Sequence, residues 1–204
     1  MFPEIKSLVN SLDTNRISNL RLQKLSNIIR HVQGKVDLKQ AVYLNFICTH
    51  NSRRSHLAQI WSQVMARFYE VPLVFCLSGG TEATAMHPNI IKSLIDHGFE
   101  ISITKKKKSN PRYFICYSEN QPPIVGFSKK YNHKFNQVED YAAIMVCDDA
   151  NENCPIVYGA VNRFALTYSD PKISDHTPEQ DAVYRDRSIE IATEMKYIFS
   201  QIDT

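Results

Sequence analysis

The amino-acid sequence predicts a three-layer α/β fold, in which a parallel sheet of about four strands lies between helices. Short apolar runs with the composition of buried strands occur at 41–47, 72–77 and 141–146. The first two runs are each followed by a loop and then by a segment with helical periodicity. Strands and helices that alternate in this order form parallel sheets, which is the basis of the prediction.

Two helices are expected before the sheet begins. Apolar spacing predicts an amphipathic helix over 16–32, with Thr14 or Asn15 as its N-cap, and a shorter helix near 4–12. We assign residues 1–38 to an N-terminal helical extension and residues 39–204 to the α/β domain. The extension either covers a sheet face or mediates dimerisation, so the sequence is compatible with a monomer or a dimer.

The remaining elements follow the second strand. A glycine pair leads from it to a helix over 88–97. Two β-forming runs, at 112–117 and 124–127, predict a β-hairpin inserted before the strand at 141–146. A final helix is expected from 178 or 179 to about 202, because proline favours the first helical turn.

Composition and charge restrict the class of protein. Of the 204 residues, 43% are hydrophobic and 22% are charged, which suits an ordinary core in one domain. A formal net charge of +3, with acidic residues between the basic ones, does not favour a nucleic-acid partner, and the basic run at 105–108 is expected to be a solvated turn. No long apolar run follows the first residues, which predicts neither a signal peptide nor a membrane span. We therefore expect a cytoplasmic protein.

A cysteine and an arginine enclose the loop after the first strand. Cys48 ends the strand, and Arg54 lies six residues later, directly before Ser55 and the next helix. Ligands of open α/β sheets lie at the carboxyl ends of the strands, where loop amides and helix N-termini favour anions. A Cys-x5-Arg loop there can surround a tetrahedral oxyanion with backbone N–H groups, while the guanidinium binds two of its oxygens. The same positive field favours the nucleophilic thiolate of Cys48, to which the Ser55 hydroxyl can donate a hydrogen bond.

These residues carry a resemblance to a known family. The segment at 46–55 resembles the phosphate loop of the low-molecular-weight protein tyrosine phosphatases, and especially that of their thioredoxin-coupled arsenate reductase branch. The segments at 78–82, 87–89 and 147–155 resemble that branch as well. The resemblance implies a flavodoxin-like sandwich, whose first loop binds an oxyanion. The implied oxyanion-binding residues are Thr49, His50, Asn51, Ser52, Arg53, Arg54 and Ser55.

Two loop positions depart from the family pattern, and two others match it. The family usually has glycine in place of His50, whose side chain either crowds the loop or adds a donor. It often has cysteine in place of Arg53, which either raises the local positive charge or points to solvent, and we favour solvent. Asn51 matches an asparagine that supports the loop and tolerates a left-handed backbone conformation. Asp170, in the pair Asp170-Pro171, matches the general acid of the family.

Three cysteines distinguish a reductase from a phosphatase. A phosphatase needs one nucleophilic cysteine, because water hydrolyses its phospho-cysteine. Arsenate reduction needs a second thiol that attacks Cys48, and preferably a third that passes the disulfide to an external reductant. Cys147 ends the strand at 141–146 and should reach the same sheet edge as Cys48, and Cys154 follows seven residues later. If the intervening stretch is helical, the two thiols lie two turns apart and must rearrange before they join.

The resemblance to the reductase branch implies an order for this relay. A disulfide between Cys48 and Cys147 forms first, a second between Cys147 and Cys154 follows, and thioredoxin reduces the second. We interpret Cys76 and Cys116 as packing residues, since both lie inside predicted strands.

The favoured hypothesis is therefore a thioredoxin-dependent arsenate reductase that acts in arsenic detoxification. We expect no metal and no tightly bound cofactor, with thioredoxin as the external reductant. One alternative is a low-molecular-weight protein tyrosine phosphatase that hydrolyses phosphate monoesters through a phospho-cysteine. Another is a non-catalytic anion-binding or redox-sensing module, in which His50 and Arg53 have altered the loop.

Overall fold

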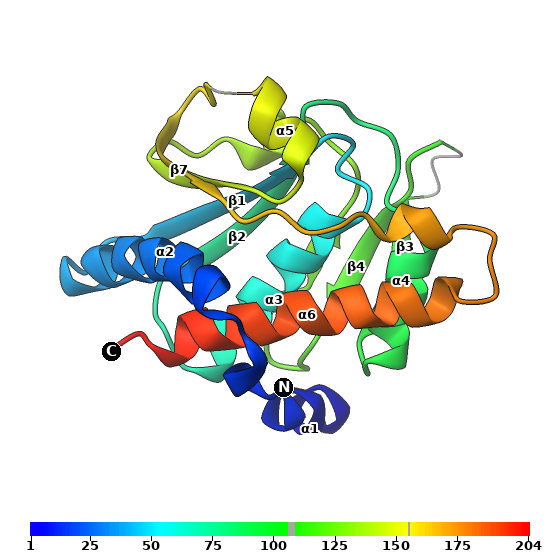
Figure 1. Ribbon diagram of the computed structural model, residues 1–204, viewed down its shortest axis with the longest axis horizontal. Coiled ribbons are helices and arrows are strands. Elements are labelled where there is room, and N and C mark those ends of the chain that lie inside the picture. The colour runs from blue at the N-terminus through cyan, green and yellow to red at the C-terminus, as the bar shows by residue number, and fades with distance from the viewer. Residues whose placement is uncertain (106–108, 155) are drawn as a thin grey trace.

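A four-stranded parallel sheet forms the centre of the computed structural model, which describes residues 1–105, 109–154 and 156–204 (Figure 1). The strand order is β2-β1-β6-β7, and β1 pairs in parallel with both β2 and β6. The strands are β1 (Val42–Cys48), β2 (Val74–Gly80), β6 (Tyr141–Met145) and β7 (Ala160–Ala165). Helices flank the sheet, which confirms the predicted three-layer α/β fold.

The sequence did not locate the edge strand β7. Its side chains are mostly exposed or half-buried, because only β6 pairs with it in the sheet. An edge strand of this kind lacks the continuous apolar run by which buried strands are recognised.

The helix α3 (Arg54–Phe68) lies between the sheet and α6 (Gln180–Ser200). Nearly all of α3 from Ser55 to Ala66 is buried, as expected for a helix that is covered on both sides. Trp61 is fully buried and donates a hydrogen bond of 2.9 Å from Nε1 to Ser188 Oγ on α6. The predicted helices at 88–97 and 178–202 are present as α4 (Pro88–Asp96) and α6. Among the described residues, no helix is both long enough and apolar enough to cross a lipid bilayer.

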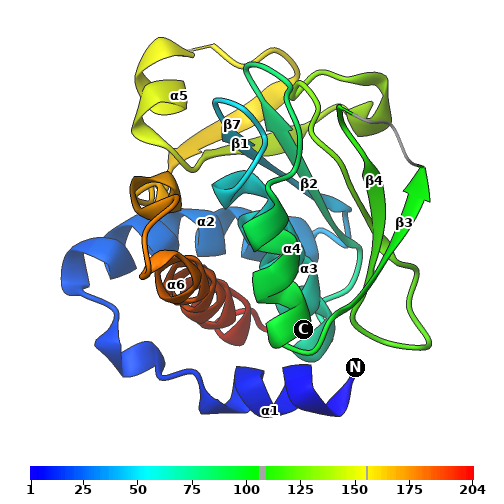
Figure 2. The same ribbon diagram turned by 90° about the vertical axis from the view of Figure 1, so that its right-hand side faces the viewer.

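The N-terminal extension consists of α1 (Pro3–Ser11), the 3-10 helix η1 (Thr14–Arg16) and α2 (Asn19–Asp37). The predicted cap at Thr14 or Asn15 is wrong, because these residues form η1 and the side chain of Ser18 caps α2 instead. Figures 1 and 2 show α1 on the side of α6 that faces away from the sheet. The buried side chains of the extension include Ile5, Val9, Leu25, Ile28 and Val32. The extension therefore adds to the hydrophobic core by packing against α6.

A second, antiparallel sheet has the order β3-β4-β5. The predicted hairpin is present as β4 (Arg112–Cys116) and β5 (Ile124–Gly126). The strand β3 (Glu100–Lys105) was not predicted from the sequence. Apolar and polar residues alternate along it, and it pairs with β4. Of the basic run at 105–108, Lys105 ends β3 and residues 106–108 lie outside the described residues.

Three short helical elements lie between β5 and the final helix. The helix α5 (Asp148–Asn153) follows β6, and the 3-10 helix η3 (Pro171–Ser174) precedes α6, while a further 3-10 helix, η2 (Lys134–Asn136), follows β5. Figure 1 shows α5 on the opposite side of the sheet from α6.

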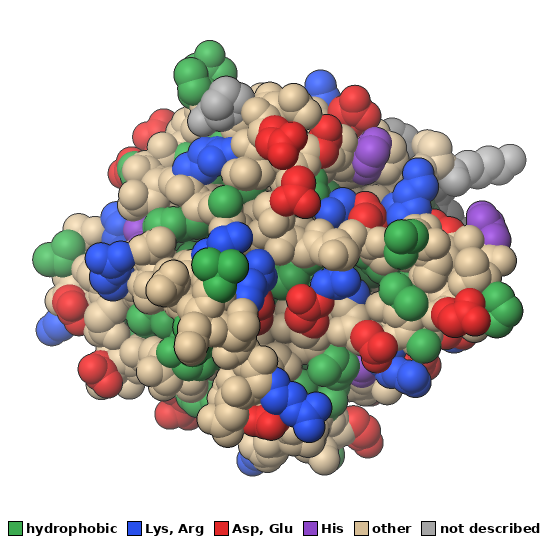
Figure 3. Space-filling view, in the orientation of Figure 1, with side chains coloured by type: hydrophobic (Ala, Val, Ile, Leu, Met, Phe, Trp, Pro, Cys, Tyr) green, Lys and Arg blue, Asp and Glu red, His purple; other side chains and the backbone are tan. Residues whose placement is uncertain are grey.

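Acidic and basic side chains are interspersed over the face drawn in Figure 3, so this face carries no large patch of one sign.

Candidate active site

The loop between β1 and α3 brings Cys48 and Ser55 together. Cys48 is the last residue of β1, and its side chain is buried. The Cys48 sulfur lies 3.1 Å from Ser55 Oγ, and Asn51 Nδ2 donates a hydrogen bond of 2.9 Å to the same hydroxyl oxygen. Because Ser55 Oγ accepts from Asn51, its own hydrogen remains available for the sulfur.

The backbone of the loop is turned so that its carbonyl groups point outward. The carbonyl oxygens of Cys48 and Thr49 accept from the amides of Thr81 and Glu82, at 3.1 and 2.8 Å. The carbonyl oxygen of Ser52 accepts from the amide of His87 at 3.0 Å. The C=O and N–H of a planar trans peptide point in opposite directions, so these bonds direct the loop amides toward the interior of the loop. Such an arrangement suits an oxyanion.

Asn51 holds the turn of this loop. Its φ angle of 44° lies in the left-handed region, which asparagine tolerates better than most residues. Its side chain is fully buried, and Asn51 Oδ1 accepts a hydrogen bond of 2.9 Å from the amide of Lys129. Asn51 thus joins the loop to the segment that follows β5.

Because Gly80 has no side chain, the end of β2 can lie close to the backbone of the loop. A Cβ atom at this position would lie 2.4 Å from the Glu82 carbonyl oxygen and 2.5 Å from that of Thr49, both of which are backbone atoms.

We expect Gly80→Ala to destabilise the protein by about 2 kcal/mol and to weaken oxyanion binding, because the backbone of the loop must move. The control is Gly34→Ala on α2, where no atom lies within 4 Å and where alanine should stabilise the helix by about 0.5–1 kcal/mol. Denaturant unfolding and phosphate titration measure both effects, and equal behaviour of the two variants would contradict the role of Gly80.

Arg54 and Asp170 lie together at the mouth of the loop. The Arg54 Nη1 atom donates a hydrogen bond of 2.9 Å to the Tyr168 carbonyl oxygen, and Nη2 forms an ion pair with Asp170. The Arg54 Nε atom is buried and has no hydrogen-bond partner among the described residues. A buried donor of this kind favours an acceptor, which an oxyanion in the loop would supply. Asp170 also caps η3, because its Oδ1 atom accepts from the amide of Lys172 at 3.0 Å.

The prediction that the Arg53 side chain points to solvent is wrong. Its Nε atom donates a hydrogen bond of 2.6 Å to the Tyr184 hydroxyl, and its Nη2 atom lies 2.7 Å from Asp175 Oδ2. Burial raises the pKa of Asp175, but the hydrogen bond from Tyr184 and the charge of Arg53 outweigh it, so the net shift is downward. Arg53 therefore attaches the loop to η3 and α6. Its partners are 122 and 131 positions away along the chain, and no local pattern identifies them.

His50 neither crowds the loop nor points into it. Its side chain is 52% exposed, and its Nε2 atom lies 3.6 Å from Glu82 Oε2 on the surface.

Cys147 lies at the same edge of the sheet as Cys48. It lies two positions after the last residue of β6, and the amide of the intervening Val146 donates a hydrogen bond of 2.8 Å to the Ile47 carbonyl oxygen on β1. The Cys147 sulfur lies 3.5 Å from Thr49 Oγ1, and Thr49 Oγ1 donates a hydrogen bond of 2.6 Å to Asp149. Burial raises the pKa of Cys147, although the contact with Thr49 opposes this shift. The hydrogen bond from Thr49 lowers the pKa of Asp149.

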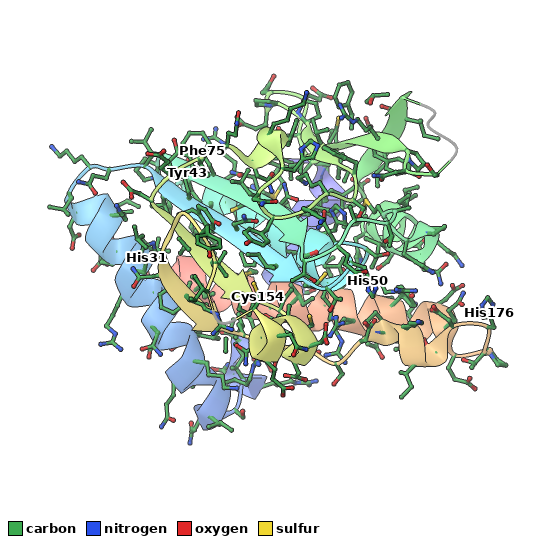
Figure 4. All side chains as sticks on the ribbon, turned by 90° about the horizontal axis from the view of Figure 1, so that it is seen from above. His31, Tyr43, His50, Phe75, Cys154 and His176 are labelled. Carbon is green, nitrogen blue, oxygen red and sulfur yellow. The ribbon has the colours of Figure 1, made fainter. Side chains whose placement is uncertain are left out.

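Cys154 lies at the other end of α5, beside which Figure 4 labels it. Its half-buried sulfur lies 3.5 Å from the Ile156 carbonyl oxygen. At a helical rise of about 1.5 Å per residue, the seven positions from Cys147 to Cys154 span roughly 10 Å. A disulfide needs Cα atoms within about 7 Å, so the two thiols are too far apart to join while α5 is intact. All five cysteines are free thiols, and Cys76 is buried inside β2 while Cys116 is partly exposed.

Comparisons with known proteins give sequence relatives and structural neighbours, although no family model matches the chain. "Arsenate reductase 2" of Staphylococcus epidermidis is 26% identical over 140 residues, which cover 65% of this chain and 79% of the relative. "Arsenate reductase" of Bacillus licheniformis is 26% identical over 143 residues, which cover 70% of this chain and 81% of the relative.

Two solved structures have a similar fold. The solution structure of a low molecular weight protein tyrosine phosphatase from Bacillus subtilis has a TM-score of 0.51 at 13% identity, covering 78% of this chain and 96% of that chain. The crystal structure of a YwlE mutant from Bacillus subtilis has a TM-score of 0.50 at 12% identity, covering 79% and 98% respectively. The chain thus has the fold of the low-molecular-weight protein tyrosine phosphatases, and its curated sequence relatives are arsenate reductases, as the residues around Cys48 predicted.

Proposed function

We propose that this chain is an arsenate reductase, in which the loop from Thr49 to Ser55 binds the oxyanion and Cys48 is the nucleophile. The observation that carries the proposal is the second thiol, Cys147, which contacts Thr49 of the oxyanion loop. A phosphatase has no use for a thiol at this place, because water completes its reaction. A reductase requires one.

In the first step, the Cys48 thiolate attacks arsenic, and a hydroxyl group leaves as water after Asp170 protonates it. Arg54 and the inward-facing loop amides hold the remaining oxygens. The product is a covalent adduct in which the Cys48 sulfur is bonded to arsenic(V).

In the second step, the Cys147 thiolate attacks the Cys48 sulfur. A disulfide forms between the two cysteines, the sulfur–arsenic bond breaks, and its electron pair reduces arsenic(V) to arsenic(III), which leaves as arsenite. Thr49 lies between Cys147 and Asp149, so its hydroxyl is placed to pass the thiol proton of Cys147 to the Asp149 carboxylate. Asp149 was not among the site residues predicted from the sequence.

In the third step, Cys154 attacks Cys147 and releases the Cys48 thiolate, and thioredoxin then reduces the disulfide between Cys147 and Cys154. This step requires α5 to unwind. The helix has six residues, of which only Ala150 is buried, and a helix this short is marginal without tertiary contacts. Unwinding also has to release Arg163, whose guanidinium donates to the carbonyl oxygens of Asn151 and Cys154.

A protein tyrosine phosphatase is the second candidate. The ion pair between Arg54 and Asp170 at the mouth of the loop favours a phosphatase as much as a reductase. Phosphate-ester hydrolysis needs only these two groups and Cys48. For either enzyme we propose no tightly bound cofactor. A reducing compartment such as the cytoplasm suits the free thiols.

Assays with two substrates, arsenate plus thioredoxin and an aryl phosphate, distinguish the two enzymes. We expect catalytic arsenite release that depends on thioredoxin, and only slow aryl-phosphate hydrolysis. The control is Cys48→Ser, which should be inactive in both assays because serine is a much weaker nucleophile. Efficient hydrolysis without arsenite release would establish the phosphatase, and inactivity with both substrates would favour an anion-binding module.

A further inference from the structure

A cavity of about 390 Å³ lies beside the oxyanion loop, between β4 and the segment that follows β5. Its charged lining consists of Arg112, Lys129, Lys130 and His133, and among the described residues no carboxylate lines it. We call this cavity the basic pocket. It is separate from Cys48 and from Arg54, which do not line it.

Lys129 is the most unusual residue of the basic pocket. Its side chain is 1% exposed, yet its ammonium group has only neutral partners, at 3.4 Å to Ser78 Oγ and 3.5 Å to the Phe127 carbonyl oxygen. Both contacts are at the long limit for hydrogen bonds. Burial, together with a smaller effect of the nearby charge of Arg112, lowers the pKa of Lys129 to about 7. A buried ammonium without a counter-charge is costly, and an anion would remove that cost.

One aromatic ring, that of Phe127, contacts two basic side chains of the pocket. The Arg112 guanidinium lies 4.3 Å from the centroid of the Phe127 ring, and Lys129 Nζ lies 4.8 Å from it. Among the described residues, neither cation forms an ion pair with a carboxylate. The geometry therefore places two basic groups against the same ring without a carboxylate partner.

The polar wall of the basic pocket is also ordered. Asn110 forms two hydrogen bonds with the backbone of Ser128, at 2.7 and 3.1 Å. Ser128 Oγ donates a hydrogen bond of 2.8 Å to the carbonyl oxygen of His50, and the Lys129 amide donates to Asn51 Oδ1. The same segment thus supports the oxyanion loop on one side and lines the pocket on the other.

We propose that the basic pocket is a second binding site for a small oxyanion of the phosphate or sulfate class. Lys129 and Arg112 supply the charge, and Lys130 adds a third cation to the lining. The proposal does not depend on which reaction Cys48 performs, because the segment that lines the pocket is hydrogen-bonded to the oxyanion loop but contains none of its reacting groups.

Calorimetric titration with inorganic sulfate tests the proposal, because the charge of sulfate does not change near neutral pH. We expect two sites in the wild-type protein and one in Arg54→Met, which removes the guanidinium from the oxyanion loop. Arg112→Met and Lys129→Met should each lose the other site and keep binding at the loop. Lys129→Met should fold, because replacing a buried unpaired charge by an apolar side chain of similar length is neutral or stabilising.

Lys134→Met is the matched control, since Lys134 is an exposed lysine of η2 that does not line the pocket. It should retain both sites. A single wild-type site that disappears in Arg54→Met would overturn the proposal, as would two sites that persist in both Arg112→Met and Lys129→Met.

Discussion

Cys147→Ser is expected to abolish arsenate reduction while keeping phosphate-ester hydrolysis within about threefold of the wild-type rate. Serine retains the size of the side chain and its contact with Thr49, but its oxygen cannot form a disulfide with Cys48. Cys147 lies beside Thr49 and outside the set of groups that bind the oxyanion, so the first covalent step should continue. Arsenite release with thioredoxin and aryl-phosphate hydrolysis are measured on the same preparation.

Two further cysteine variants make this result specific. Cys154→Ser should release arsenite in a single turnover and then stop, because the disulfide between Cys48 and Cys147 can form but cannot be passed on. Cys116→Ser is the matched control, since Cys116 ends β4 in the second sheet, and it should behave as the wild type. Full reductase activity in Cys147→Ser would remove this cysteine from the mechanism.

Arg21→Met is expected to lower the free energy of unfolding by about 3 kcal/mol, because it leaves the buried carboxylate of Glu194 without its counter-charge. Arg21 on α2 forms two hydrogen bonds of 2.6 Å with Glu194 on α6, and the Glu194 side chain is only 5% exposed. Arg21 also donates to the Thr167 carbonyl oxygen at 2.9 Å, while Tyr168 donates to Glu194 at 2.6 Å. The variant should therefore loosen the segment that carries Asp170.

The matched control for this prediction is Arg16→Met, in the same N-terminal extension. Arg16 pairs with Asp13, but its side chain is 87% exposed, so its removal should change the stability by less than about 0.5 kcal/mol. Denaturant midpoints of the two variants give the comparison. Equal midpoints would show that the contact between α2 and α6 adds no more than a surface ion pair.

Much of the central fold was predictable because its signals are local. The apolar run at 41–47 and the helical periodicity after it identified β1 and α3, and therefore placed Cys48 and Arg54 at the carboxyl edge of the sheet. The strands that were missed, β3 and β7, lack such a run, and the side chains of β7 are exposed or half-buried. The predicted resemblance to arsenate reductases also rested on local motifs, those around Cys48 and Cys147.

What the sequence by itself determined was the strand–loop–helix unit with its cysteine and arginine, together with the presence of two further thiols. Only the tertiary structure decided that Arg53 binds Asp175 and Tyr184, that Thr49 lies between Cys147 and Asp149, and that Lys129 is buried without a counter-charge. These contacts join positions 131, 98 and 78 residues apart, as in the pairs Arg53–Tyr184, Thr49–Cys147 and Asn51–Lys129. Periodicity and motif spacing report on neighbours along the chain, whereas such contacts depend on how the sheets and helices pack.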